Sequence, residues 1–300
     1  MTSSQSEPHV PADNREDPTS KMSFFDHLGE LRQRILYSVV AIAAGLCVGL
    51  YFADDAFRIL AEPMLVALRD ANLADKLIYT SPLGPIRLYI TVGLYLGIVL
   101  ASPVVLHQLW LFLAPGLYRH ERRAVLTFLC SSVLLFLAGT AFGYYVLLPM
   151  TLKFLVSIPG PFTAMISIND YFDMILVILL GLGVVFQLPI LVFFLTLFHI
   201  VTPAFLWNNF RYAVLVIAIL AAVVTPTTDI LTLMIFMAPM LILYLLSIGV
   251  SAAVVSKRAK EPGTSPAGAS TTVIAVGLLV AGAATLLWAG QHFGWWRLWP

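Results

Sequence analysis

The residues whose chemistry stands out lie in a short basic loop at positions 114–123, between two long apolar runs. The loop holds one carboxylate, Glu121, among three arginines, Arg119, Arg122 and Arg123. A carboxylate can accept hydrogen bonds from a guanidinium group, so Glu121 could bind a positively charged ligand. A simpler interpretation is also open: the arginines mark the cytoplasmic side of a membrane protein, and Glu121 neutralises one of them.

A second carboxylate, Glu30, lies in a segment of helical periodicity before the first apolar run. Phe24, Leu28, Leu31 and Ile35 recur at the spacing of one helix face, with Glu30 off this stripe. We expect an interfacial helix that leads into the membrane. On composition alone, this helix could serve only as a membrane-surface anchor.

The composition of the chain is that of a polytopic membrane protein. Hydrophobic residues make up 60% and charged residues 11% of the 300 residues, and the mean hydropathy is +0.91. These values lie far outside the range of soluble domains. The net charge of +1 provides no basic field for nucleic acid. We therefore predict an all-α membrane protein in contact with the lipid bilayer and with no nucleic-acid partner.

Apolar runs predict the membrane spans, because about 20 helical residues cross a hydrocarbon core of about 30 Å. Six spans are predicted, at residues 35–53, 88–107, 125–150, 174–198, 210–225 and 230–256. The fifth contains the shortest charge-free run. Thr202 and Pro203 have the types of an N-cap and a first helical residue, so this helix is expected to begin outside the apolar run.

The segments that flank the core at residues 22–258 differ in character. Residues 1–21 are polar, have no signal-peptide pattern and are predicted to form a disordered tail. Residues 259–272 are predicted to form a linker rich in Gly, Ser, Pro and Thr. Residues 273–300 form an extra hydrophobic segment, predicted to contain a seventh span.

The distribution of Lys and Arg predicts that the N-terminus is cytoplasmic. In this orientation eleven of the 17 Lys and Arg residues lie inside, as the positive-inside rule favours. The segment 54–87 then forms an ordered external loop. Glu30 and Glu121 lie together on the cytoplasmic side.

The sequence predicts no enzyme, metal site or cofactor. Cys47 and Cys130 lie inside apolar runs, and the six histidines show no ligand spacing. The chain has no Gly-rich phosphate-binding motif. A small-solute secondary transporter that uses polar residues such as Gln187, Asp170 and Asp173 is the alternative, but transporters of that class need charges at mid-membrane, where this chain has almost none.

Four motifs, in order along the chain, resemble the TatC family of the twin-arginine protein translocase. They are HLGELRQR at 27–34, QLWLFLAPGLYRHERR at 108–123, FQLP at 186–189 and TPTTD at 225–229. The resemblance implies a six-helix, cup-shaped inner-membrane protein that binds twin-arginine signal peptides of folded proteins. It further implies single-span TatB and TatA-type partners, self-association in a multimeric complex, and export driven by the proton-motive force.

The resemblance also implies roles for individual residues. Glu121 corresponds to the carboxylate that recognises the arginine pair, and Glu30 to an acidic residue of the same site. Phe112, Arg119 and Arg32 correspond to neighbours that shape the site. A guanidinium is a planar fork of donors whereas a lysine ammonium is a point charge, so selectivity for arginine requires shape as well as charge.

Further polar candidates lie in or near the predicted spans. Gln187, at a position where relatives often carry Glu, needs a partner from another helix or a water-filled cavity, and its amide cannot take up a proton. Asp229, at the external mouth between the fifth and sixth spans, could cap the sixth helix or serve transport. Thr225 and Thr232 could contact a partner helix, although Leu233 stands where the family usually has glutamine.

Overall fold

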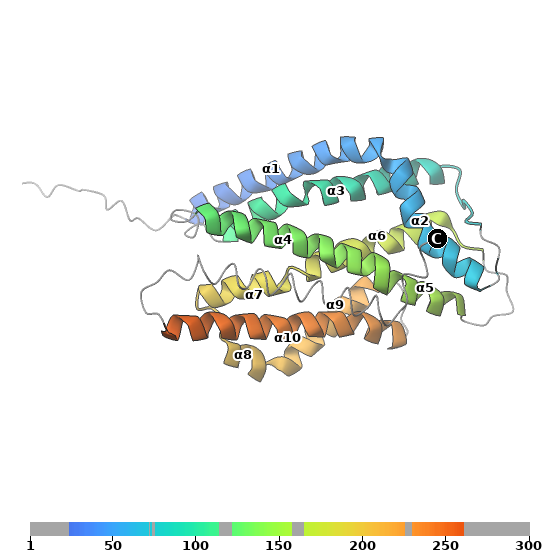
Figure 1. Ribbon diagram of the computed structural model, residues 1–300. Helices are drawn as coiled ribbons and strands as arrows, with labels where there is room; N and C mark the ends of the chain where they lie inside the picture. Colours follow the sequence, from blue (N-terminus) through green and yellow to red (C-terminus); the bar gives the residue numbers. More distant parts are fainter. Residues whose placement is uncertain are drawn as a thin grey trace, which may run out of the picture.

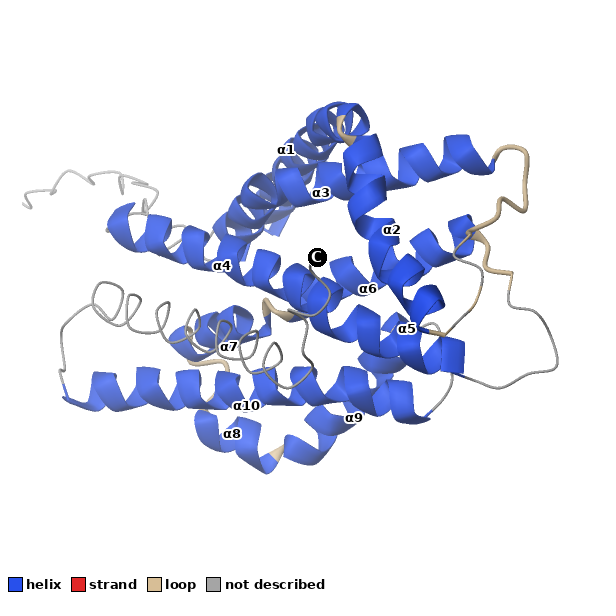
Figure 2. Cartoon of the chain, turned by 45° about the vertical axis from the view of Figure 1, so that its right-hand side comes forward, coloured by secondary structure: helices blue, strands red, loops and turns tan. Residues whose placement is uncertain are grey.

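The computed structural model describes residues 24–71, 73, 76–113, 122–157, 165–225 and 230–260. Nearly all of these residues are helical, which confirms the predicted all-α class (Figure 2). This part of the chain contains one isolated β-bridge, between Ile78 and Ser167. Five helical stretches within it are long and apolar enough to cross a bilayer.

The long helices run back and forth between the two ends of an elongated bundle (Figure 1). They are α1 (Phe24–Tyr51), α3 (Gly84–Leu113), α4 (Arg122–Phe142) continued by the π-helical turn η2 (Gly143–Leu147) and α5 (Leu148–Ser157), α6 (Ile168–Val185) followed by α7 (Leu188–Leu197), and α10 (Ile230–Lys260). One end, on the left of Figure 1, holds the start of α1 and the last turns of α3 and α10. We call it the α1 end. The opposite end, which holds α2 (Ala53–Asp70), is the α2 end.

Helices α1 and α3 approach each other through glycines. A Cβ atom on Gly45 would lie 2.4 Å from the carbonyl oxygen of Gly97, and one on Gly49 would lie 2.2 Å from that of Gly93. These distances are too short for any side chain, so the two backbones are in direct contact. Small residues allow this approach in membranes, where helix association depends on close packing because lipid is as apolar as the side chains.

The apolar stripe predicted before the first span is exposed at Leu28 and Ile35. Helix α1 begins at Phe24, so the expected interfacial helix and the first span form one element. Leu28 and Ile35 are 43% and 53% exposed, whereas the side chains of Glu30 and Arg34 are only 21% and 18% exposed. The stripe therefore suits contact with lipid, and the polar face of α1 turns toward α3.

The segment 54–87 contains a helix, where the sequence predicted an ordered loop. Leu60, Met64 and Leu68 recur at helical spacing and are buried in a cluster that also contains Leu152 of α5 and Ile175 of α6. Helix α2 therefore lies across the ends of these helices as an amphipathic cover (Figure 1). The apolar face of a short helix between charged residues is a weaker sequence signal than an uninterrupted run.

Pro63 changes the hydrogen bonding of α2. Proline has no N–H, so the carbonyl of Ile59, four residues earlier, lacks its helical donor. The hydroxyl of Tyr144 in η2 donates to this carbonyl at 2.7 Å. Tyr171 of α6 donates to the next carbonyl, that of Leu60, also at 2.7 Å. Two tyrosines thus attach α2 to the α2 end of the bundle.

The fifth predicted span is the short helix α9 (Phe210–Val224), which follows α8 (Pro203–Asn208). Thr202 is the N-cap of α8, and its Oγ1 accepts from the backbone N–H of Phe205 at 3.2 Å, as the Thr-Pro pair predicted. Helix α9 has 15 residues, or about 22 Å at 1.5 Å per residue, which is shorter than a bilayer core.

Three of the predicted segments lie wholly or mostly outside the described residues. They are the tail at 1–21, the linker at 259–272 apart from its first two residues, and the extra segment at 273–300. The two described residues of the linker belong to α10. The seventh span therefore stays a prediction from the sequence.

Candidate functional site

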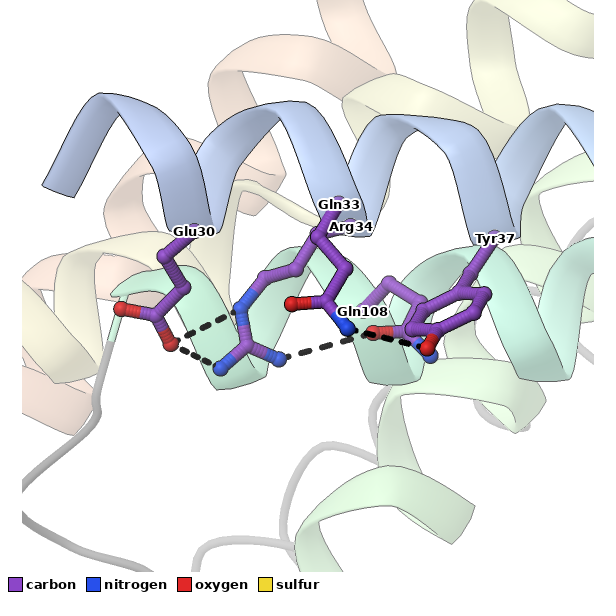
Figure 3. A network of polar contacts seen from close by, with 5 residues as sticks. All are labelled: Glu30, Gln33, Arg34, Tyr37 and Gln108. Atoms are coloured by element: carbon purple, nitrogen blue, oxygen red, sulfur yellow. Dashed lines mark hydrogen bonds and ion pairs between the residues drawn. The ribbon is translucent and has the colours of Figure 1, made fainter. Parts of the chain in front are cut away.

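At the α1 end, Glu30 and Arg34 form an ion pair on the face of α1 that turns toward α3 (Figure 3). Nε of Arg34 donates to Oε1 of Glu30 at 3.1 Å, and Nη2 donates to the same oxygen. Nη1 of Arg34 lies 3.5 Å from Oε1 of Gln108 on α3. The four-residue spacing places the pair one helical turn apart. The pair thereby connects α1 with the last turns of α3.

The carboxylate of Glu30 retains acceptor capacity. Its second oxygen, Oε2, is buried and accepts no hydrogen bond from any residue in the described ranges. A carboxylate offers about four lone-pair sites, and leaving a buried acceptor unsatisfied costs free energy. Glu30 can therefore accept further hydrogen bonds from a cationic ligand.

The structure describes three of the five residues predicted for signal-peptide binding. Glu30 and Arg32 are both on α1, but Arg32 is exposed, and Arg34 rather than Arg32 holds the carboxylate. Phe112 is half-buried near the end of α3. Glu121 and Arg119 fall outside the described residues, in the segment that joins α3 to α4. That segment starts a few residues beyond the α3 turn that meets Arg34.

Sequence reasoning missed Arg34 and Gln108 as parts of this cluster. The spacing of Glu30 and Arg34 carried a usable signal, because side chains four residues apart meet on a helix surface. Gln108 opens one of the family motifs, but its contact with Arg34 joins residues 74 positions apart. A contact of that kind depends on how α1 and α3 pack, which spacing in the sequence does not reveal.

A second polar cluster surrounds Gln187, at the junction of α6 and α7. Oε1 of Gln187 accepts from Oγ of Ser132 at 2.8 Å, and Nε2 donates to the carbonyl of Ser132 at 2.9 Å. Nε1 of Trp110 donates to Oγ of Ser132 at 2.8 Å. The predicted need of Gln187 for a partner on another helix is confirmed. These uncharged groups connect α3, α4 and the α6–α7 junction inside the bundle.

Pro189 explains why α6 and α7 are separate helices where one span, 174–198, was predicted. Proline has no backbone N–H, so it cannot continue the hydrogen bonding of α6. Pro189 lies two residues after Gln187, which is the N-cap of α7. At this break between the helices, the Gln187 side chain points toward α4, where it bonds to Ser132. The family motif at 186–189 therefore contains both the break between two helices and a buried polar side chain.

The remaining polar candidates lie where α9 meets α10. Thr225 ends α9 and is buried, and its Oγ1 has no hydrogen-bond partner among the described residues. Thr232 is fully buried in the first turns of α10. Asp229 falls outside the described residues, so its predicted capping role stays a prediction.

Comparison with known proteins identifies the family. A family model described as Sec-independent protein translocase protein (TatC) matches residues 26–239. The chain is also 46% identical over 251 residues to the TatC protein of Koribacter versatilis, covering 84% of this chain and 93% of that protein. The chain belongs to the TatC family.

Other TatC proteins agree in sequence and in fold. The chain is 36% identical over 246 residues to TatCy of Bacillus subtilis, covering 81% of this chain and 93% of that protein. A crystal structure described as the twin-arginine translocase receptor TatC superposes with a TM-score of 0.68. The two chains are 34% identical, and the match covers 76% of this chain and 98% of that chain.

Membership of the TatC family confirms the predicted role as a protein translocase subunit of the Tat system. It also supports the prediction of a transport component rather than an enzyme, and it replaces the alternative of a small-solute transporter. Together with the long apolar helices, it establishes a multi-pass membrane protein.

Proposed function

We propose that this TatC family member binds the twin-arginine signal peptide of folded proteins at the α1 end and nucleates the translocation complex for export driven by the proton-motive force. The observation that carries the proposal is the carboxylate of Glu30. One of its oxygens already accepts from a guanidinium, and the other is buried with no partner among the described residues. This carboxylate suits a second guanidinium.

Glu121 supplies the second carboxylate of the proposed site. It lies in the segment that follows α3, and α3 meets the Glu30 cluster through Gln108. A hydrogen bond to a charged group contributes about 1.5–3 kcal/mol net, and micromolar affinity corresponds to about 8 kcal/mol. Two carboxylates that each accept two such bonds would contribute about 6–12 kcal/mol, which is comparable to the free energy of micromolar recognition of an arginine pair.

The proposed orientation places the α1 end in the cytoplasm, in an inner membrane. The signal peptide of an export substrate reaches the translocase from that side. The excess of Lys and Arg in the loops of the α1 end supports this orientation. The proposal includes the seventh span at 273–290, which would place residue 300 outside the cell.

We further propose that TatB and TatA-type single-span subunits contact the protein where α9 meets α10. The buried hydroxyl of Thr225 lacks a partner in the described part of the chain, and a polar group in the membrane gains from a hydrogen bond to a neighbouring helix. Thr232 and Asp229 belong to the same region. Cross-linking from Val223, an exposed residue of α9, to a single-span subunit would test this contact; its absence in cells that export normally would contradict it.

An export assay tests the proposed function. The chain is produced in cells that lack their own TatC protein, together with a reporter that carries a twin-arginine signal peptide. E30Q and E121Q are expected to lower export strongly, because each removes a negative charge and keeps the side-chain size. D173N, at the α2 end, is the matched control with the same chemical change. Equal export by wild type, E30Q and E121Q would contradict the proposal.

A further inference from the structure

Arg34 occupies the position at Glu30 that the guanidinium of a ligand would take. Its Nε and Nη2 both donate to Oε1 of Glu30 (Figure 3). An arginine side chain of a bound peptide would need hydrogen bonds from the same carboxylate. The inference that follows rests on the proposed function of Glu30 and concerns how tightly the site binds its ligand.

Arg34 contacts only one of the two carboxylate oxygens of Glu30. Both nitrogens reach a single carboxylate oxygen, whereas the strongest pairing of arginine with a carboxylate uses both oxygens. Oε2 receives no hydrogen bond from the described residues. Arg34 therefore leaves the acceptor capacity of Oε2 unused.

Gln108 gives the Arg34 side chain a second acceptor. Its Oε1 lies 3.5 Å from Nη1 of Arg34, beyond the usual length of an N–H···O hydrogen bond. A small movement of Arg34 toward α3 would shorten this contact and lengthen the contact with Glu30. The guanidinium can therefore leave the carboxylate without losing every acceptor.

We propose that Arg34 is a built-in competitor for Glu30 that lowers the affinity of the site for every cationic peptide. An incoming guanidinium bonds both oxygens of Glu30 while Arg34 shifts toward Gln108. A lysine ammonium must displace the same guanidinium but has no planar fork of donors, so it gains less from the carboxylate and binds more weakly than arginine.

The test measures dissociation constants of a twin-arginine signal peptide and of the same peptide with two lysines, on the full chain in lipid nanodiscs. R34Q removes the competitor and is expected to strengthen binding of both peptides. The two peptides should gain by about the same factor, on the order of tenfold, because each displaces the same guanidinium. Q108L removes the second acceptor, keeps Arg34 on Glu30 and is expected to weaken twin-arginine binding.

R211Q is the control for loss of one positive charge. Arg211 is exposed at the start of α9, where it donates to the hydroxyl of Tyr212, so the affinity for both peptides should stay at its wild-type value. R34K keeps the positive charge and replaces R34Q in the binding test if R34Q does not fold. A lysine side chain lacks the fork and holds Glu30 less tightly, so R34K should also strengthen binding of both peptides.

Two outcomes separate this inference from the proposed function. Unchanged affinities for both peptides in R34Q or R34K, while E30Q still weakens twin-arginine binding, would overturn the role of Arg34 and leave the proposed function in place. Unchanged twin-arginine binding in E30Q would contradict the proposed function itself.

Discussion

Gln187 and Ser132 exchange two hydrogen bonds across 55 positions of sequence. Ser132 Oγ donates to the side-chain oxygen of Gln187, and the Gln187 amide nitrogen donates back to the Ser132 carbonyl. The amide orientation is fixed by this exchange, because a rotated amide would place two acceptors together at the Ser132 carbonyl. Gln187 therefore acts as an uncharged connection between α4 and the α6–α7 junction.

Gln187→Leu is expected to destabilise the protein by about 1–2 kcal/mol. Hydrogen bonds between membrane helices contribute about 0.6 kcal/mol on average and up to about 1.7 kcal/mol, and this substitution removes two of them. Thermal unfolding in detergent measures the loss, with Gln33→Leu on the exposed face of α1 as the control for the same chemical change. A double-mutant cycle with Ser132→Ala should show coupling of at least about 0.5 kcal/mol. Additive effects would contradict the direct contact.

Gly97→Ala should disrupt the packing of α1 on α3. A Cβ atom at Gly97 would lie 2.6 Å from the backbone nitrogen of Leu46, and backbone cannot move aside as a side chain can. Gly249→Ala in α10 is the matched control, because nothing lies within 4 Å of a Cβ atom there. Alanine favours a helix over glycine by about 0.5–1 kcal/mol, so the control should be neutral or stabilising. Similar melting temperatures for both variants would show that the helices are not in backbone contact.

Tyr144→Phe should cost about 0.5–1.5 kcal/mol of stability, because it removes the donor to the Ile59 carbonyl. The cost should shrink in a Pro63→Ala background, since alanine restores the N–H that proline lacks. Chemical or thermal unfolding of the four proteins in this cycle gives the coupling. If the Tyr144→Phe effect is the same with proline and with alanine at position 63, the hydroxyl does not replace the missing helical donor.

A reporter fused after residue 300 should lie outside the cytoplasm. The apolar run at 273–290 is long enough to cross the membrane after α10, which returns the chain to the α1 end. Fusion after residue 260 provides the opposite expectation and serves as the internal control. Cytoplasmic activity of both fusions would rule out the seventh span.

The sequence predicted the long helices well because lipid imposes uninterrupted apolar runs. It did not predict α2, whose single buried face lies between charged residues, or the break at Pro189 within an otherwise apolar run. At the site, the sequence predicted Glu30 through its motif. The i, i+4 spacing places Arg34 beside this carboxylate, whereas the contact of Arg34 with Gln108 depends on how α1 packs on α3.

The most direct test of the central claim is the affinity of the full chain in nanodiscs for a twin-arginine signal peptide, measured with wild type, E30Q, E121Q and the D173N control. Loss of one charge-assisted hydrogen bond corresponds to about tenfold or more in affinity. The account predicts a loss of at least this size for E30Q and for E121Q, and wild-type affinity for D173N. Equal affinity of all four proteins, or equal binding of the twin-lysine peptide by wild type, would contradict it.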